Sequence, residues 1–252
     1  MSRNFELLQE AGKAADMLRQ RAQEFAAPVA EEVFVPGTPF LPMEGAAREE
    51  VTKLVQRLFL MSGGQRTRQV VFSGTEQGNG CSWICAHAAD ILAAQTAASV
   101  CVVDCDVHYP TLHTEFQVAN HYGLAEALQS GEPARQFAQQ LSRPNLWLLS
   151  SGSGNENTQR LLTLDRMRKR MFELRAEFDY VLLDVAPLNS GNHATVLGSW
   201  CDGVALVLKA NSSSRKAARK AVQDLQDAKA SVLGAVLNQR TFPIPQSIYN
   251  RL

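Results

Sequence analysis

A glycine-rich segment between an apolar run and a helix-like stretch is the first place where residue types and spacing suggest chemistry. Gly78 and Gly80 lie within Ser73–Trp83 and allow backbone N–H groups to close around phosphate oxygens. The helix start that follows adds a favourable potential for an anion. Ser82 stands where a hydroxyl ligates Mg²⁺, but the position before it, which is lysine in a P-loop, is Cys81. The segment predicts a phosphate-binding loop without its cation.

Carboxylates end two other apolar runs. Asp104 and Asp106 follow the run that starts at Ser99, and Asp184 ends the run that starts at Tyr180. The carboxyl ends of parallel strands form the ligand-facing edge of an open α/β sheet, so these side chains are expected beside the glycine-rich loop. Asp184 stands at the position of a Walker B aspartate, which holds Mg²⁺. The alternative is that polar residues simply suit exposed strand ends.

The elements that must position these residues are strands alternating with helices. Short apolar runs rich in β-branched residues predict strands at Gln69–Ser73, Ser99–Asp104, Leu146–Ser150, Tyr180–Asp184, Val204–Leu208 and Ser231–Leu237. Helical spacing predicts helices at Ser82–Gln95, Leu124–Ser130, Thr158–Ala176 and Ser214–Lys229. This alternation is typical of an α/β fold with a mostly parallel sheet flanked by helices, as in P-loop NTPases.

The chain before the first strand reads differently. An apolar stripe at helical spacing predicts an extra N-terminal amphipathic helix over residues 1–26, and prolines predict an extended linker over 27–45. The main domain is predicted over 46–240, followed by a tail at 241–252. Its first helix, about 46–61, is expected to bury Val51, Leu54, Val55 and Leu58.

Composition narrows the classes of protein. The chain has 252 residues, 25 basic and 25 acidic, and 45% are hydrophobic. This balance is ordinary for a globular protein and makes a nucleic-acid partner an unfavoured interpretation. No apolar stretch approaches the roughly 20 residues of a membrane-spanning helix. The N-terminus has no apolar signal region, so a cytoplasmic protein is expected. Five cysteines, an odd number in a chain this long, do not predict a disulfide scaffold.

Several motifs in order resemble those of one family. Gly74-Thr-Glu-Gln-Gly-Asn-Gly-Cys-Ser-Trp83 is similar to Ser-Ala-Glu-Pro-Gly-Glu-Gly-Lys-Ser-Thr, and Val103-Asp-Cys-Asp-Val-His-Tyr-Pro110 to Val-Asp-Ala-Asp-Leu-Arg-Arg-Pro. Gly123–Leu128, Asn145–Gly152 and Ser199–Val204 also match. Over about 46–240 the chain resembles the bacterial tyrosine kinases (BY-kinases) of capsule and exopolysaccharide biosynthesis, which belong to the ParA/MinD-like P-loop ATPases.

The resemblance implies a set of roles for named residues. ATP with Mg²⁺ is implied as the cofactor, with nucleotide contacts from Gly78, Asn79, Gly80, Cys81, Ser82 and Trp83. Ser82, Asp104 and Asp184 are implied near the metal, and Asp104 and Asp106 near the attacking hydroxyl as catalytic residues. The 46–61 helix resembles one that docks a neighbouring subunit, which implies a homo-oligomer. The implied partner is a membrane polysaccharide co-polymerase, or chain-length determinant, which holds the protein at the inner membrane.

Departures from the family pattern leave two functions open. Cys81 replaces lysine, Trp83 replaces a small residue, and Tyr249 stands alone in a tail where the family carries a tyrosine cluster. Loss of the lysine cation predicts a rate loss of about two to four orders of magnitude. The first interpretation is a catalytically impaired regulatory or scaffolding partner of the chain-length determinant. The alternative is an active ATP-dependent protein-tyrosine autokinase in which another cation replaces the lysine.

Two further features keep alternatives. Cys81 begins a helix, whose dipole can lower a thiol pKa and create a reactive thiol; the other interpretation is a small, unreactive replacement. The 214–229 helix carries a basic cluster, which is an ordinary solvated face or a contact for DNA phosphates or anionic lipid. The cluster is formed by Arg215, Lys216, Arg219 and Lys220.

Overall fold

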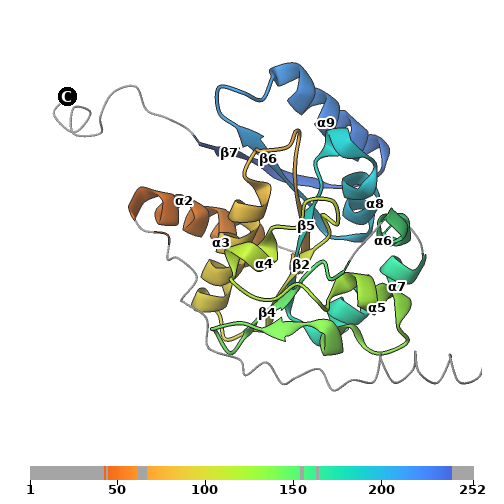
Figure 1. Ribbon diagram of the computed structural model, residues 1–252. Coiled ribbons are helices and arrows are strands. Elements are labelled where there is room, and N and C mark those ends of the chain that lie inside the picture. The colour runs from red at the N-terminus through yellow and green to blue at the C-terminus, as the bar shows by residue number, and fades with distance from the viewer. Residues whose placement is uncertain (1–42, 44, 62–66, 154–155, 163–164, 240–252) are drawn as a thin grey trace, which may run out of the picture. The chain divides into compact units, whose positions relative to one another are not determined.

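The computed structural model describes residues 43, 45–61, 67–153, 156–162 and 165–239 (Figure 1). The predicted 1–26 helix, all but two residues of the 27–45 linker and the 241–252 tail lie outside these residues. Within the described ranges, no helix combines the length and the apolar character that crossing a membrane requires.

A single seven-stranded sheet forms the centre of the fold. Its strand order is β3-β4-β2-β5-β1-β6-β7, and every neighbouring pair is parallel except β3–β4, which is antiparallel. All six predicted strands are present, and the short edge strand β3 is an addition. The strands are β1 (Gln69–Gly74), β2 (Val100–Asp104), β3 (Gln139–Gln140), β4 (Leu146–Leu149), β5 (Tyr180–Val185), β6 (Gly203–Lys209) and β7 (Val232–Asn238).

Helices cover both faces of the sheet, as Figure 1 shows. One face carries α2 (Gly45–Val55), its π-helical continuation η1 (Gln56–Leu60), α3 (Cys81–Gln95) and α4 (Leu112–Glu115). The other face carries α5 (Leu124–Gln129), η2 (Ala134–Phe137), α6 (Glu156–Leu161), α7 (Asp165–Glu177), η3 (Leu188–Ser190), α8 (His193–Trp200) and α9 (Arg215–Asp227). The predicted α/β class with a mostly parallel sheet is therefore confirmed.

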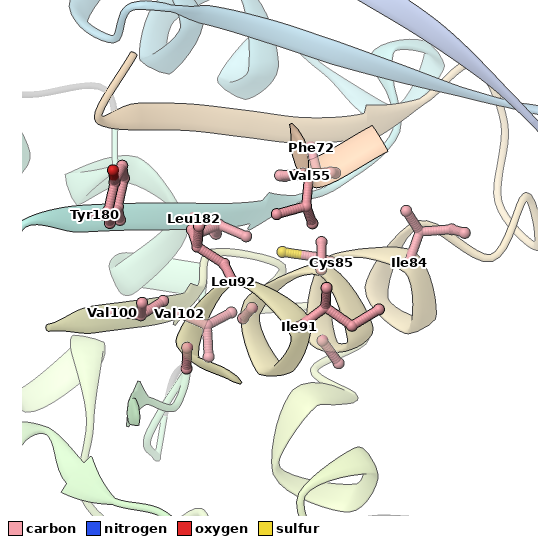
Figure 2. Packing of buried hydrophobic residues seen from close by; sticks show 14 of the residues in the cluster. Val55, Phe72, Ile84, Cys85, Ile91, Leu92, Val100, Val102, Tyr180 and Leu182 are labelled. Atoms are coloured by element: carbon pink, nitrogen blue, oxygen red, sulfur yellow. The ribbon is translucent and has the colours of Figure 1, made fainter. Parts of the chain in front are cut away.

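Each face has its own apolar core. On the α3 face, Val55 and Phe72 lie close to Cys85, and Leu92 lies beside Leu182 (Figure 2). On the opposite face the buried side chains include Leu128, Met167, Leu174, Leu197 and Leu225. The central strands β1, β2 and β5 are buried along their whole length. This two-sided burial explains why their sequences are continuous apolar runs instead of alternating ones.

The helix predicted at about 46–61 is present as α2 and η1, and it buries Val51, Val55 and Leu58 as expected. Leu54, also expected to be buried, is half-buried against the same core. Phe59 in the π-helical turn packs edge-on against Tyr180 at the start of β5, with ring centroids 5.7 Å apart. This contact anchors the end of the helix to the centre of the sheet.

Besides the short helices α4, η2 and η3, which were not predicted, the helices differ from the prediction in two places. The helix predicted at Thr158–Ala176 is two helices, because α6 ends at Leu161 and α7 begins at Asp165. Asp165 lies in the first turn of α7, where a carboxylate is favoured by the helix dipole. Helix α8 was not predicted, because only its residues Ala194, Leu197 and Gly198 are buried and the apolar stripe is short.

Candidate functional site

The glycine-rich loop connects β1 to α3 at the carboxyl edge of the sheet. Gly78 and Gly80 have φ angles of 79° and 77°, in the left-handed region that glycine adopts without steric cost. The N-cap residue of α3 is Gly80, which has no side chain to cap the helix that begins at Cys81. The first N–H groups of a helix have no intrahelical acceptor, so this end of α3 offers backbone donors to a bound anion.

The side chain of Asn79 points into the protein and stabilises the loop. Its side chain is only 3% exposed, and its Nδ2 donates to Thr75 Oγ1 and to the backbone oxygen of Val207 on β6, both at 3.1 Å. Its backbone oxygen accepts a hydrogen bond of 2.9 Å from Asn238 Nδ2 at the end of β7. The Asn79 side chain therefore connects the loop to β6.

Asp104 and Asp184 lie next to each other on neighbouring strands. They are register partners on β2 and β5, and their residues are 0% and 1% exposed. Asp104 Oδ2 accepts the N–H groups of Thr111 and Leu112 at 3.2 and 3.1 Å, and Oδ1 accepts that of Asp106 at 3.2 Å. Burial, followed by the nearby Asp184, raises the pKa of Asp104 well above its usual range. The carboxylate of Asp104 thus organises the segment that follows β2.

Asp184 is less completely satisfied. Burial raises its pKa to about 7, although hydrogen bonding from Ser82 and Cys81 acts in the opposite direction. Its Oδ2 atom is buried and receives no hydrogen bond from the residues that the structure describes. A buried, unpartnered carboxylate oxygen beside a hydroxyl fits a divalent cation such as Mg²⁺, which takes one or two carboxylates and completes its shell with phosphate oxygens and water. Across the same described ranges, no group of three or more His, Cys, Asp or Glu is arranged to hold a metal alone.

The side chain of Cys81, near the carboxylate of Asp184, is a neutral thiol. Burial is the main cause that raises the pKa of Cys81 well above its usual range, and the charge of Asp184 adds to it. The thiol lies near enough to Asp184 to lower the pKa of that carboxyl group. The raised pKa argues against a reactive thiolate at Cys81, because burial and the neighbouring carboxylates both disfavour the charged form. The structure favours the unreactive replacement.

Two more carboxylates act on the same region. Asp106 is half-buried, with Oδ1 accepting the N–H of Tyr109 at 3.1 Å, and Glu115 comes from α4. Their charges both act to raise the pKa of Asp184. Within the described ranges, no lysine or arginine forms an ion pair with Asp104, Asp106, Glu115 or Asp184. Sequence reasoning missed Glu115, because its segment carries no readable motif.

Trp83 lies on the first turn of α3 but packs inward. Its ring contacts His87 edge-on, with centroids 4.3 Å apart, and it lies against the core of the α3 face. Burial lowers the pKa of His87 to about 4, so this imidazole is neutral near pH 7. The structure thus brings Ser82 and Cys81 together with Asp184, while the side chains of Asn79 and Trp83 point into the protein.

The basic cluster lies on α9, which follows β6 in the chain. Arg215, Lys216, Arg219 and Lys220 are exposed, and Lys220 pairs with Asp224 in the same helix. Ala221 and Leu225 form the buried side. The three interpretations of this helix remain open.

Comparison with known families gives one match over most of the chain. Residues 67–231 match the family described as cellulose biosynthesis protein BcsQ. The tyrosine-protein kinase YwqD of Bacillus subtilis is 30% identical over 174 residues, which cover 69% of this chain and 73% of YwqD. The tyrosine-protein kinase Etk of Escherichia coli is 25% identical over 203 residues, but this chain spans only 28% of the length of Etk.

Solved structures agree on the fold. The kinase domain of Escherichia coli ETK superposes with a TM-score of 0.74 at 23% identity and covers 83% of this chain and 84% of that domain. A ParA family ATPase from Chlorobium tepidum gives a TM-score of 0.56 at 18% identity, over 69% of this chain and 74% of the other. At these identities the likeness concerns the arrangement of strands and helices.

Proposed function

Because the chain belongs to the family of the cellulose biosynthesis protein BcsQ, and is a relative of the bacterial tyrosine kinases within the ParA/MinD-like P-loop ATPases, we propose that it is a catalytically impaired member of exopolysaccharide or capsule biosynthesis. In this proposal it binds Mg²⁺–nucleotide weakly. It acts as a regulatory or scaffolding partner of a membrane chain-length determinant, which recruits it from the cytoplasm to the inner membrane.

The observation that carries this proposal is the position of Cys81 at the start of α3, directly after Gly80. A thiol stands where the family carries a lysine, and the nearby carboxylate of Asp184 is buried with one oxygen unpartnered among the described residues. A triphosphate that enters this site encounters several carboxylates. Among the described residues, none of these carboxylates forms an ion pair with a lysine or arginine. The site therefore lacks one preorganised charge that would attract the triphosphate and stabilise the leaving oxygen.

The remaining groups support binding. The loop with Gly78 and Gly80 offers backbone N–H groups to phosphate oxygens, and Ser82 with Asp184 Oδ2 offers ligands to a metal. Bound Mg²⁺ supplies charge neutralisation for the phosphates. The protein's own residues hold and orient the ligand, while Asp104 keeps the segment after β2 in place. Binding with slow phosphoryl transfer is the combination that these residues favour.

An active autokinase is the second candidate. The retention of Ser82, Asp104, Asp106 and Asp184 favours it, provided that a cation arrives from outside the site. The 46–61 helix is the proposed surface for a neighbouring subunit in a homo-oligomer. On this helix Lys53 pairs with Glu50 at 2.7 Å, and both side chains are exposed. Residues 45–50 are exposed as well, so the first turns of α2 are accessible to a second subunit.

Measurement of Mg²⁺–ATP binding and turnover with three proteins separates the candidates. The unmodified protein is compared with Cys81→Lys, and Cys81→Ala controls for loss of the thiol alone. The impaired protein is expected to bind weakly and turn over no faster than Cys81→Ala. Cys81→Lys is expected to raise turnover by about two orders of magnitude or more. Fast turnover by the unmodified protein, abolished by Asp184→Asn, would establish the autokinase instead.

A test in cells addresses the scaffolding role. A strain that lacks the protein is complemented with the unmodified chain or with Cys81→Ala, and secreted polysaccharide is measured. A scaffold is expected to restore the polymer equally with both chains and to co-purify with the chain-length determinant. Failure of the unmodified chain to co-purify with any membrane component of the export system would contradict the proposed partner.

A further inference from the structure

Asn238, the last residue of β7, connects the far side of the sheet to the glycine-rich loop. Its Nδ2 donates to the backbone oxygen of Asn79 at 2.9 Å, and its Oδ1 accepts the N–H of Gln239 at 2.8 Å. Its own backbone oxygen accepts the N–H of Ala210 at 2.8 Å, which pairs the end of β7 with the end of β6. With both amide atoms engaged, the side chain has one defined orientation.

This contact sets the direction of one peptide group in the loop. The described chain contains no cis peptide bond. In a planar trans peptide the C=O and the following N–H point in opposite directions. Because the oxygen of Asn79 points to Asn238, the N–H of Gly80 points away from β7. In the strand order, β2 and β5 lie on that other side of β1, and they carry Asp104 and Asp184.

The amide of Asn238 lies close to Gly80, and other hydrogen bonds hold Asn79 in place. A Cβ atom on Gly80 would lie 2.3 Å from Asn238 Nδ2, so the amide sits directly over the glycine. Asn79 is held independently by its own side chain, which bonds to Thr75 Oγ1 and to the oxygen of Val207. Rotation of the Asn79–Gly80 peptide would therefore break the bond to Asn238 while Asn79 itself stays in place. Asn238 is the group that decides between the two peptide orientations.

We infer that Asn238 is a positioning residue that aims the Gly80 N–H at a bound phosphate. The inference rests on the proposed function, because it concerns the phosphate-binding loop of the same site. It assigns the loop a partner on β7, and neither the loop motif nor the acidic residues point to that strand.

The first test uses the ligand-free protein, so that it does not depend on nucleotide binding. Backbone NMR compares Asn238→Ala with Leu237→Ala, a control on the same strand whose side chain is 55% exposed. Asn238→Ala is expected to shift the carbonyl ¹³C of Asn79 and the amide of Gly80, and to add exchange broadening at Gly80. Leu237→Ala is expected to leave both signals unchanged. An unchanged Gly80 amide in Asn238→Ala would overturn the inference.

The second test measures binding of Mg²⁺–ADP, Mg²⁺–pyrophosphate and adenosine. Loss of one neutral hydrogen bond is expected to weaken both phosphate ligands about three- to tenfold in Asn238→Ala. Asn238→Asp is expected to weaken them further, because it places a carboxylate oxygen against the oxygen of Asn79. Adenosine affinity is expected to stay unchanged. Equal weakening of adenosine and ADP would mean that Asn238 contacts the base, and the inference would fail.

The two failures are distinguishable. If the unmodified protein binds neither Mg²⁺–ADP nor Mg²⁺–pyrophosphate, the proposed function fails, and with it the phosphate role of Gly80. The NMR comparison still decides whether Asn238 fixes the peptide. If the unmodified protein binds both ligands and Asn238→Ala binds them equally well, the proposed function stands and the positioning role is wrong.

Discussion

Two buried charged side chains, Arg170 and Asp184, differ in how completely the protein satisfies their hydrogen bonds. Arg170 on α7 is 4% exposed, and its guanidinium donates to the backbone oxygens of Ala127, Ser130 and Glu132 and pairs with Glu173. Asp184 is 1% exposed, yet its Oδ2 finds no partner among the described residues. The first region completes the bonding of its charge within the chain, and the second leaves it incomplete.

The difference separates a charge that serves the fold from one that awaits a ligand. A buried ion costs free energy unless its hydrogen bonds are satisfied. Around Arg170 the loops after α5 provide those bonds, so the guanidinium ties α5 to α7. Around Asp184 the fold supplies a hydroxyl and a thiol, and the pKa rises to about 7. The negative charge of Asp184 is therefore incompletely compensated by the protein, and a bound cation would stabilise it.

The largest expected change in stability comes from removing the buried charge whose hydrogen bonds are satisfied. Arg170→Met leaves three backbone oxygens and Glu173 without their donor, so it is expected to lower the free energy of unfolding by about 3–5 kcal/mol. Urea denaturation measures the change. Lys169→Met is the matched control on the same helix: Lys169 is 71% exposed and lies 3.9 Å from Glu173, so a change within about 0.5 kcal/mol is expected. Similar losses in both variants would remove the contrast between the regions.

A smaller effect of opposite sign is expected at the unsatisfied region. The folded pKa of Asp184 is about 7, above its ordinary value of 3.8, so the folded chain binds the proton more tightly than the unfolded chain. Its contribution to stability therefore falls as the pH rises from about 4 to about 7. Without Mg²⁺, Asp184→Asn is expected to stabilise the protein by about 1–3 kcal/mol at pH 8 and by less at pH 5. Urea denaturation in EDTA at both pH values measures this.

Asp202→Asn is the matched control for that prediction. Asp202 accepts the N–H groups of Arg68 and Gln69 at 2.7 and 2.8 Å and pairs with Arg175 at 3.0 Å. The same substitution at this satisfied carboxylate is expected to destabilise the protein by about 1–3 kcal/mol. Destabilisation by both substitutions at pH 8 would show that Asp184 has partners that offset its burial.

The smallest expected effect concerns the thiol beside Asp184. Asp184→Asn removes one of the charges that raise the pKa of Cys81, while burial, the main cause, remains. Alkylation of Cys81 at pH 8 is therefore expected to accelerate only about three- to tenfold. Site-resolved mass spectrometry measures it, with the buried Cys101 as an internal reference. An equal acceleration at Cys101 would indicate general loosening of the fold.

The sequence allowed the strands and the loop to be predicted because both signals are local. The runs that form β1 and β5 consist mostly of apolar residues, and the glycines before Cys81 stand in a recognisable order. Two errors had local causes too. The short apolar face of α8 gave too little periodicity, and the break at Leu162 left no proline or glycine between α6 and α7.

The partners of the site were harder to predict, because they are far apart in the chain. Glu115 and Asn238 reach the loop region from α4 and β7, and no spacing rule connects them to Gly80. Asp104 is predicted to lie near a ligand, and the structure adds that one of its oxygens accepts the N–H groups of Thr111 and Leu112. Which carboxylate is satisfied depends on loop backbone geometry, which residue types do not encode.

The strand order has a consequence for synthesis on the ribosome. β1 lies in the interior of the sheet, but Gln69 pairs with Val181 and Val70 pairs with Gly203, so its neighbours are made much later. At about 5–20 residues per second, the nascent β1 waits on the order of ten seconds for β6. Asn238 emerges later still. A chain still being translated therefore carries the loop sequence without these neighbours, and the loop gains the hydrogen bond from Asn238 only after the last strand is made.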